Sequence, residues 1–153
     1  MKWIIDIHSK KPYPANIMSN YASNAFYVDG IEVASMEGFL QSLKEQDPVR
    51  QKEVCLLDGP SAKKRGTDIN WQESGLLYWK GMPIHRNSFA YRELISHAYD
   101  QLLTNSVFRE ALASTGRCVL FHSVGKVRKK DTCLTIQEFL YQMYRVRRKI
   151  RRT

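Results

Sequence analysis

Residues 35–44 have the sequence SMEGFLQSLK, which carries a helical pattern on two faces. Four apolar residues follow the i, i+3, i+4, i+7 spacing of a buried helical stripe: Met36, Phe39, Leu40 and Leu43. Ser35 precedes this stripe and is a favoured N-cap residue. A second set, spaced i, i+4, i+7, consists of Glu37, Gln41 and Lys44. We therefore predict a core helix that begins after Ser35 and presents these three polar side chains on one face.

Short strands are expected before this helix. Residues 3–7 form a β-branched run that predicts a strand. Two further short runs, Phe26–Val28 and Ile31–Val33, are joined by Asp29-Gly30. They predict a hairpin, because Asp-Gly accommodates the positive φ of a tight turn. Residues 11–24, between the strand and the hairpin, are rich in turn-forming residues and predict a loop.

Helices dominate the expected structure after residue 44. In chain order we predict a helix from Asp47-Pro48 to about Leu57, a single turn at 61–65 closed by Gly66, helices at 88–103 and about 107–113, a buried strand at 118–121, and a final helix that starts at a capping box of Thr135 and Glu138. Residues 67–86 contain several glycines and Pro83, and we expect them to form a structured loop.

The composition fits one globular domain with an α+β, helix-rich fold and a short N-terminal β-hairpin or small sheet. The 153 residues have a 43% hydrophobic content and no apolar run long enough to span a membrane. Asp6 interrupts the start of the chain, which excludes a typical signal peptide. The three cysteines lack metal-ligand or disulfide-framework spacing, so we expect reduced thiols in a cytoplasmic protein.

Positive charge is concentrated near the C-terminus. The net charge is +9, and six of the last ten residues are basic while none is acidic. A second basic cluster lies at 126–130. We expect a domain at 1–147 followed by a basic tail at 148–153, which provides a surface for nucleic acid. The alternative interpretation is a solvated tail that only improves solubility.

Several segments resemble the NADAR family, also called YbiA-like. The matching segments are Met18-Ser19-Asn20, Phe26, Asp29-Gly30, residues 35–44, residues 62–66, Leu120-Phe121-His122-Ser123 and a final helix ending in Arg147. The resemblance covers about Ile17 to Arg147, and the small size and shortened motifs resemble phage-encoded branches of the family. It implies an N-glycosidase that releases a ribose phosphate or ADP-ribose unit. Some members act on phosphoribosyl intermediates of riboflavin synthesis, and others remove ADP-ribose from guanine in DNA.

The resemblance also implies roles for individual residues. Glu37 matches the family's catalytic glutamate, Lys44 its helix lysine and Asn20 the asparagine of its opening motif. Trp79, in preference to Trp71, is the counterpart of a family tryptophan. The family has an acidic residue and a Trp-Gly segment after the strand that ends here at His122. This chain has no tryptophan there, and Asp131 is the candidate acid.

The predicted reaction sets chemical demands on these residues. Cleavage of a ribosyl–nitrogen bond passes through an oxocarbenium-like state, which an ionised carboxylate stabilises. Glu37 lies in the first helical turn, where we expect it to stay ionised. Asp131 or Lys44 is expected to protonate the leaving base. The candidate substrate-binding residues are Asn20, Gln41, Trp79, Lys80, Arg86, His122, Ser123 and Gly125, with Lys63 and Lys126 as further cations. The reaction needs no metal and no cofactor.

Structural interpretations of the same residues stay open. Glu37 and Lys44 alone are typical of a well-capped helix with a solvated face. Trp79 is equally expected to cover the edge of the core, His122 to make a structural hydrogen bond, and Asp131 to pair with a neighbouring lysine. Two functions therefore compete with hydrolysis. One is a non-catalytic nucleic-acid-binding protein that uses its basic tail, and the other is a protein that binds ADP-ribose without cleaving it.

Overall fold

The computed structural model describes residues 3–151 and has an α+β architecture. The helices of this part are α1 (Ala15–Met18), α2 (Met36–Ser42), α3 (Pro48–Cys55), α4 (Gly59–Gly66), α5 (Phe89–Leu102), α6 (Ser106–Ser114), the 3₁₀ turn η1 (Lys129–Asp131) and α7 (Ile136–Arg151). The strands are β1 (Ile4–Asp6), β2 (Phe26–Val28), β3 (Ile31–Val33), β4 (Leu76–Trp79), β5 (Met82–His85) and β6 (Val119–Phe121). The predicted fold class, helix-rich with a short N-terminal hairpin, is confirmed.

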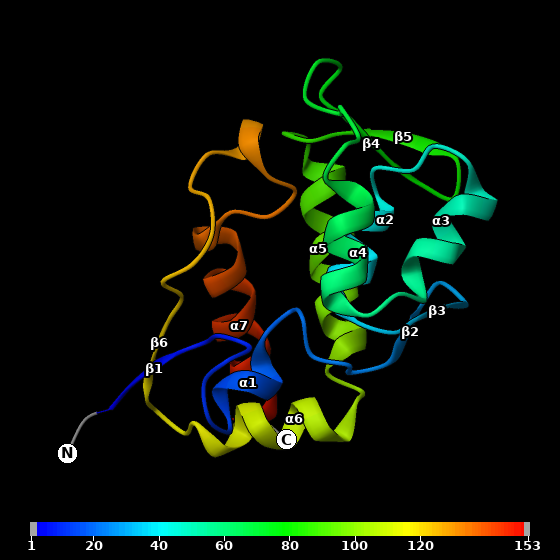
Figure 1. Cartoon of the computed structure of the whole chain (residues 1–153). Coiled ribbons are helices and arrows are strands. Elements are labelled where there is room, and N and C mark those ends of the chain that lie inside the picture. Colours follow the sequence, from blue (N-terminus) through cyan, green and yellow to red (C-terminus); the bar gives the residue numbers. More distant parts are fainter. Residues whose placement is uncertain (1–2, 152–153) are drawn as a thin grey trace.

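The strands pair into small separate sheets. β1 and β6 pair in parallel beside α7, with Ile5 opposite Leu120. The antiparallel hairpins β2–β3 and β4–β5 lie on the other side of the molecule, near α3 and α5 (Figure 1). The predicted turn of the first hairpin is confirmed, because Asp29 and Gly30 have φ values of 49° and 82°.

Helix α2 is enclosed on all sides. Ser35 caps it, since the Ser35 hydroxyl accepts a hydrogen bond from the Gly38 amide at 3.0 Å. A Cβ on Gly38 would lie 3.0 Å from the carbonyl oxygen of Leu57, so the absence of a side chain lets α2 approach the end of α3 closely. All seven residues of α2 are buried. Glu37 is therefore not on a solvated helix face, whereas Lys44, the lysine of that alternative interpretation, lies beyond the end of α2 and is half-buried.

The hydrophobic core connects α2 with the two long helices. Phe39 and Leu43 of α2 are fully buried with Tyr91 and Tyr99 of α5 and Met143 of α7. The periodic pattern of the 88–103 segment correctly predicted α5. The capping box of α7 is also confirmed. Glu138 accepts a hydrogen bond from the Thr135 amide, and the Thr135 hydroxyl accepts one from the Glu138 amide.

Three expectations about loops and turns are wrong. Residues 67–86 contain the hairpin β4–β5, whose turn residues Lys80 and Gly81 both have positive φ. A lysine at the first turn position gave no hairpin signal, and Pro83 is accommodated in the exposed strand β5. The expected loop at 11–24 contains α1. Helix α4 starts at Gly59, two residues before the predicted turn, because Asp58 caps it through the Ser61 amide.

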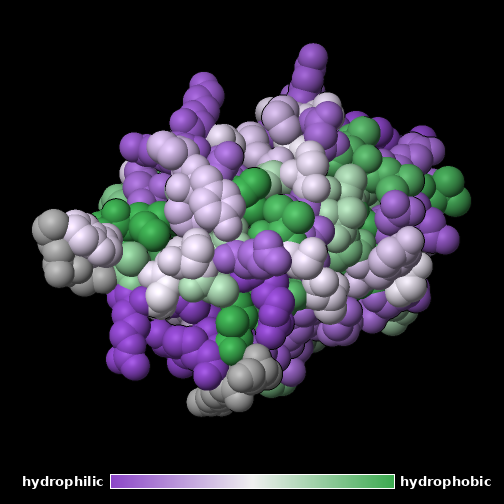
Figure 2. Space-filling view, turned by 90° about the horizontal axis from the view of Figure 1, so that it is seen from below, coloured by the Kyte–Doolittle hydropathy of each residue, from purple (hydrophilic) through white to green (hydrophobic). Residues whose placement is uncertain are grey.

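Strand β6 also differs from the expectation of a buried strand. Only Leu120 is buried, whereas Val119 and Phe121 are exposed. With Ile4 they form an apolar area at the end of the molecule where β1 and β6 lie (Figure 2). Two strands without a covering layer on both faces leave alternate side chains in solvent.

Helix α7 continues past the predicted domain boundary at residue 147. Residues 148–151 are helical, and 152 and 153 lie outside the described residues. The division into a domain at 1–147 and a tail at 148–153 stays a prediction. No helix between residues 3 and 151 is long and apolar enough to cross a membrane. The three cysteines are free thiols, and Cys55 and Cys133 are buried.

Candidate active site

The Glu37 carboxyl is the buried acid at the centre of the candidate site. Its side chain is 8% exposed, and one oxygen, Oε2, accepts a hydrogen bond of 2.7 Å from Gln41 Nε2. Its backbone amide donates to the carbonyl oxygen of Asn20 at 2.9 Å. The start of α2 is thereby fixed to the segment that precedes the first hairpin. We call Glu37 and its surroundings the Glu37 site, which comprises Asn20, Tyr21, Glu37, Gln41, Lys44, Lys63 and Tyr99.

Burial controls the protonation of Glu37. It raises the pKa of this carboxyl above its ordinary value of 4.5, because the charged form loses hydration. The hydrogen bond from Gln41 and the positive charges of Lys63 and Lys44 oppose that rise without cancelling it. The position at the helix N-terminus favours the charged form of Glu37, whereas burial acts against it and raises the pKa. That Glu37 is ionised near neutral pH stays a prediction. A carboxyl of this kind takes up and releases protons closer to neutrality than an exposed one.

Gln41 positions Glu37 and is itself positioned by α4. Its carbonyl oxygen Oε1 is buried without a hydrogen-bond partner among the described residues. A Cβ at Gly66 would collide with this oxygen, so only glycine allows the end of α4 to lie against the amide. Gln41 therefore contacts the Glu37 carboxylate on one side and the α4 backbone on the other. The structure supports Gln41 as a positioning residue beside its expected role in substrate binding.

Lysines surround the carboxyl at a greater distance. Lys44 donates a hydrogen bond of 3.1 Å to the Gly66 carbonyl. Burial lowers the pKa of Lys44, and the neighbouring charges of Lys63 and Lys126 act in the same direction. Lys63 is exposed on α4 and Lys126 on the loop after β6. Lys44 and Lys63 therefore act on the buried Glu37 carboxyl, and Lys126 lies near Lys44.

Polar aromatic groups close the other side of the site. Tyr99 of α5 donates a hydrogen bond of 2.7 Å to Oδ1 of Asn20. Burial, and then the Glu37 charge, raise the pKa of Tyr21, while burial raises the pKa of Tyr99 further. Both phenols therefore stay protonated near neutral pH and serve as donors. Asn20 thus lies beside Glu37 with its Oδ1 bonded to Tyr99, and its expected role in substrate binding stays a prediction.

Two tyrosines and a cysteine of this region had no signal in the sequence. Tyr99 fitted the core pattern of α5, and Tyr21 lay in an expected loop. Cys133 is buried, and burial raises its pKa to about 11, while the Lys44 and Arg86 charges oppose the rise. Its distance along the chain from Glu37 hid the proximity that tertiary packing creates. One indirect indication for these three residues was present in the sequence: Tyr21 directly follows Asn20 of the opening motif.

Trp79 and Lys80 lie around Asp29, outside the Glu37 site. The Trp79 indole donates a hydrogen bond of 2.8 Å to Oδ2 of Asp29, and its ring packs edge-on against Phe39 at 5.1 Å. Lys80 Nζ donates to the Asp29 backbone oxygen, and His97 Nε2 lies 3.0 Å from Asp29 Oδ1. Trp79 is buried, so its contacts link the two hairpins to the core. Its stacking on a substrate base stays a prediction.

Arg86 is engaged in the core beside α7. Its side chain is 3% exposed, and its guanidinium donates two hydrogen bonds to the Glu138 carboxylate, at 3.1 and 2.6 Å. A third, from Nε, goes to the Thr132 carbonyl at 2.9 Å. The structure thus gives Arg86 a full set of internal acceptors. Its predicted contact with a substrate phosphate is untested.

The segment after β6 holds the remaining predicted residues. Ser123 binds Asp6 through its amide and hydroxyl, at 3.0 and 2.7 Å. His122 Nδ1 lies 2.8 Å from the Ile7 carbonyl oxygen, and its ring packs on Phe139 at 4.7 Å. Phe139 also contacts Tyr99, so His122 lies one ring away from the Glu37 site.

Gly125 and Asp131 complete the set. Gly125 has a φ of 144°, and a Cβ there would lie 2.9 Å from Ile136 Cγ1. Asp131 accepts a hydrogen bond of 2.9 Å from Arg128 within the exposed loop that contains η1. The groups that act on the Glu37 carboxyl come from α2 and α4, and Asp131 belongs to neither. In the described part of the chain, no three His, Cys, Asp or Glu side chains are grouped closely enough to hold a metal ion.

Comparison with solved structures defines the class of fold. The NMR structure of the E. coli protein YbiA matches with a TM-score of 0.67 at 16% sequence identity. The match covers 98% of this chain and 86% of that one. The architecture around the Glu37 site is therefore a YbiA-like fold, as the resemblance implied.

Sequence comparison identifies the family within this class. The chain belongs to the bacteriophage protein GP30.3 family, whose model matches residues 12–148. One relative is the uncharacterized 17.1 kDa protein in the Gp30-rIII intergenic region of Enterobacteria phage T4. It is 36% identical over 139 residues, which cover 89% of this chain and 91% of the relative. The expected relation to phage-encoded proteins agrees with both matches.

Proposed function

We propose that this chain is a NADAR-type N-glycoside hydrolase that cleaves a ribosyl–base bond. The leading reaction is removal of ADP-ribose from guanine in DNA, and related ADP-ribosyl or phosphoribosyl compounds are the next candidates. The observation that carries the proposal is the Glu37 carboxyl, which is buried with one amide contact and near several cations. Burying a carboxyl without full compensation costs stability, and such cost is typical of catalytic groups.

The reaction is a hydrolysis at the anomeric carbon of the ribose. The bond from this carbon to the base nitrogen breaks, and the positive charge that develops on the sugar is stabilised by the ionised Glu37 carboxylate. Water then adds to the carbon and gives one proton to Glu37. The departing nitrogen takes one proton from a general acid, and the proton that Glu37 received from water passes through solvent to restore this acid before the next turnover. The products are free ADP-ribose and unmodified guanine that stays in the DNA or, for a phosphoribosyl substrate, ribose phosphate and the released base.

Lys44 is our choice for the general acid over Asp131. Lys44 is half-buried in the turn that follows α2, and burial lowers its pKa, which makes the proton easier to transfer. Asp131 is bound to Arg128 outside this cluster. Lys63 and Lys126, both exposed beside the site, provide charge for substrate phosphates.

The proposal is tested by turnover on a substrate panel. Purified protein is incubated with single-stranded DNA that carries ADP-ribosylated guanine and with phosphoribosylated pyrimidine intermediates, and released ADP-ribose, ribose phosphate and base are measured by chromatography. Glu37→Gln is expected to lower turnover by roughly 100-fold or more. The matched control is Glu32→Gln, because Glu32 is exposed on β3 and is expected to leave turnover unchanged.

Each outcome of this panel decides between the candidate functions. Turnover that depends on Glu37 supports hydrolysis. Equal activity of the wild type and Glu37→Gln contradicts the role of the carboxyl. Binding of ADP-ribose by calorimetry without turnover assigns the chain to the non-cleaving binders. The pH profile adds a second readout, since the rate should rise with pH as Glu37 ionises, over a range above 4.5.

A further inference from the structure

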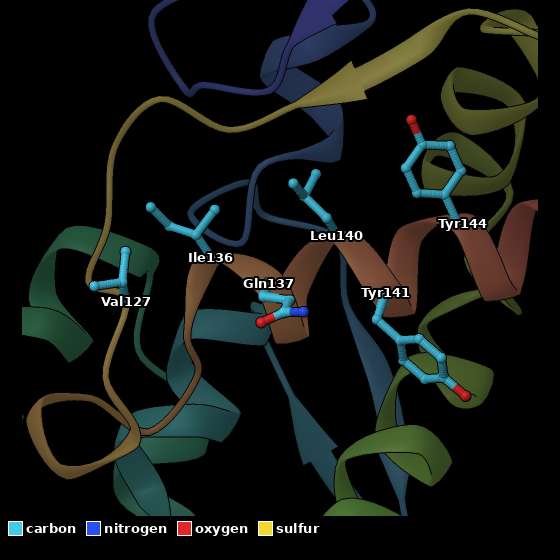
Figure 3. A pocket seen from close by; sticks show the side chains of 6 residues that line it. All are labelled: Val127, Ile136, Gln137, Leu140, Tyr141 and Tyr144. Carbon is cyan, nitrogen blue, oxygen red and sulfur yellow. The ribbon is translucent and has the colours of Figure 1, made fainter.

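A groove runs along α7, on a part of the molecule separate from the Glu37 site. It consists of two adjoining hollows that share Val127, Gln137 and Tyr141 as lining residues. The hollow of about 440 Å³ lies between α7 and the loop after β6, and Figure 3 shows Val127 facing Ile136 across it. The hollow of about 530 Å³ lies between α5 and α7. We call both together the α7 groove.

Aromatic rings are presented to solvent along the α7 groove. Tyr141 is 59% exposed and lines both hollows. Phe89, at the start of α5, is 66% exposed and lines the larger one. Tyr144 lines the smaller hollow one turn further along α7. Rings held apart on a rigid helix pair offer flat faces on which planar groups can stack.

Cations accompany these rings. The Arg92 guanidinium lies over the Phe89 ring, 5.5 Å from its centroid, and Lys129 lines the same hollow. Two carboxylates also line it. Glu138 is neutralised by Arg86, whereas Glu93 is exposed. Lys130 is exposed on the adjoining loop, where Asp131 is paired with Arg128, so positive charge exceeds negative charge around the groove.

The contacts of the C-terminal arginines and lysine bear on the expected role of the basic C-terminus. Arg147 is buried and donates to Thr115 and to the Cys118 carbonyl. Arg145 and Lys149 both bind Asp100. Several of the basic residues at the end of the chain are therefore internally engaged, and the α7 groove offers the better surface for a polyanion.

We propose that the α7 groove binds single-stranded nucleic acid, with bases stacked on Tyr141 and Phe89 and phosphates near Arg92 and Lys129. Alternating rings and cations are the features by which proteins bind single strands without reading sequence. A duplex hides its base faces, so rings in hollows of this size favour an unpaired strand. The inference does not require Glu37 to be catalytic, because the groove residues belong to other elements.

The test is fluorescence anisotropy with a labelled oligothymidine of about 12 nucleotides and with a mixed-sequence duplex of equal length. We expect the single strand to bind more tightly, and its affinity to fall as salt rises. Tyr141→Ala should weaken binding roughly tenfold. Tyr27→Ala is the matched control, because Tyr27 is 60% exposed on β2, away from the groove. Lys129→Ala is compared in the same way with Lys52→Ala, since Lys52 is exposed on α3.

Several results overturn the proposal. The first is equal affinity of Tyr141→Ala and Tyr27→Ala for the single strand, and the second is equal affinity of the wild type for duplex and single strand. The third is absence of binding at low salt, in which case a protein is the remaining candidate partner of the groove. Thermal melts by circular dichroism establish that each variant is folded. Glu37→Gln should bind the oligothymidine as the wild type does, so failure of the groove and failure of the proposed hydrolysis are separate results.

Discussion

The first turns of α2 and α7 each hold a glutamate, Glu37 buried and Glu138 partly buried, and the two carboxyls have opposite environments. Glu138 receives two hydrogen bonds from Arg86 and one from the Thr135 amide. Burial raises the pKa of Glu138, but these bonds outweigh it and hold the pKa below its ordinary value of 4.5. Glu37 receives one side-chain hydrogen bond, from Gln41, and burial raises its pKa.

The difference separates a structural carboxylate from a candidate catalytic one. The charge of Glu138 is neutralised by Arg86 within the fold, so Glu138 does not need a substrate group to balance it. Glu37 is held in place by Gln41, but too few donors and cations contact it to offset the cost of burying its charge. Its negative charge is therefore available to stabilise a cationic transition state. Both residues lie near a helix N-terminus, and that position alone did not distinguish them. The number and charge of the tertiary partners did.

The largest expected effect on stability comes from breaking the α7 pair. Arg86→Ala removes the buried member of the pair and leaves the partly buried Glu138 without it, and we expect a loss of about 3–5 kcal/mol in the free energy of unfolding, measured by urea denaturation. Because the pKa of Glu138 is lowered in the fold, the pair stabilises above about 4.5 and its contribution is lost as pH falls through the lowered value. Arg50→Ala is the control, since Arg50 is exposed and should change stability by less than about 0.5 kcal/mol. A loss that small for Arg86→Ala would remove the contrast between the two glutamates.

The next effect tests how Gln41 holds Glu37. Gly66→Ala places a methyl group against Gln41 Oε1, and we expect a loss of roughly 1–3 kcal/mol together with reduced turnover. Gln41→Ala makes room for this methyl group. In a double-mutant cycle the combined variant should therefore lose less stability than the sum of the two single changes. Strict additivity would show that Gly66 does not act through Gln41.

A smaller effect of opposite sign is expected at Glu37. Glu37→Gln removes a buried charge and should stabilise the protein by about 1 kcal/mol at neutral pH, a rise in Tm of roughly 2–4 °C. Because the folded state raises the pKa of Glu37, the wild type loses stability as pH rises from 4.5 through the raised value. The difference between the two proteins should thus vanish below about pH 4. Calorimetric melts at both pH values check this, and a lower Tm for Glu37→Gln at neutral pH contradicts it.

The smallest effect is expected at Asp131. Asp131→Asn weakens a partly exposed pair with Arg128, so both stability and turnover should change little, with less than about 0.5 kcal/mol in unfolding. The measurement is a single-turnover rate beside Lys44→Met, which should be far slower. A tenfold drop for Asp131→Asn would make Asp131 the general acid and exclude Lys44 from that role.

Local sequence patterns predicted most of the fold because they act over a few residues. The spacing of Met36, Phe39, Leu40 and Leu43 fixed α2, and the Asp29-Gly30 turn fixed the first hairpin. The β4–β5 hairpin was missed, because Lys80 adopts a positive φ at the turn and lysine is not a residue type that indicates a positive φ. Contacts with α5 and with Gln51 stabilise this turn from outside it.

Local sequence patterns predicted only part of the candidate site. Glu37, Gln41 and Lys44 could be placed on one helix face, and the opening motif brought in Asn20. Trp79, Arg86 and Ser123 were selected as isolated polar or aromatic residues, and the fold gives them partners of their own in Asp29, Glu138 and Asp6. The type of a single residue does not predict which distant residue it will contact in the folded chain.

The sequence by itself determined where most of the helices begin, which faces they bury and that Glu37 and Gln41 share one face of α2, with Lys44 just past its end. Only the tertiary structure decided that this polar face is enclosed, that α4 presses on Gln41 at Gly66, and that Glu37 has too few partners while Glu138 has enough. Helix formation depends on neighbours within one or two turns. Desolvation and charge pairing depend on groups that are distant in the chain, and folding alone brings them together.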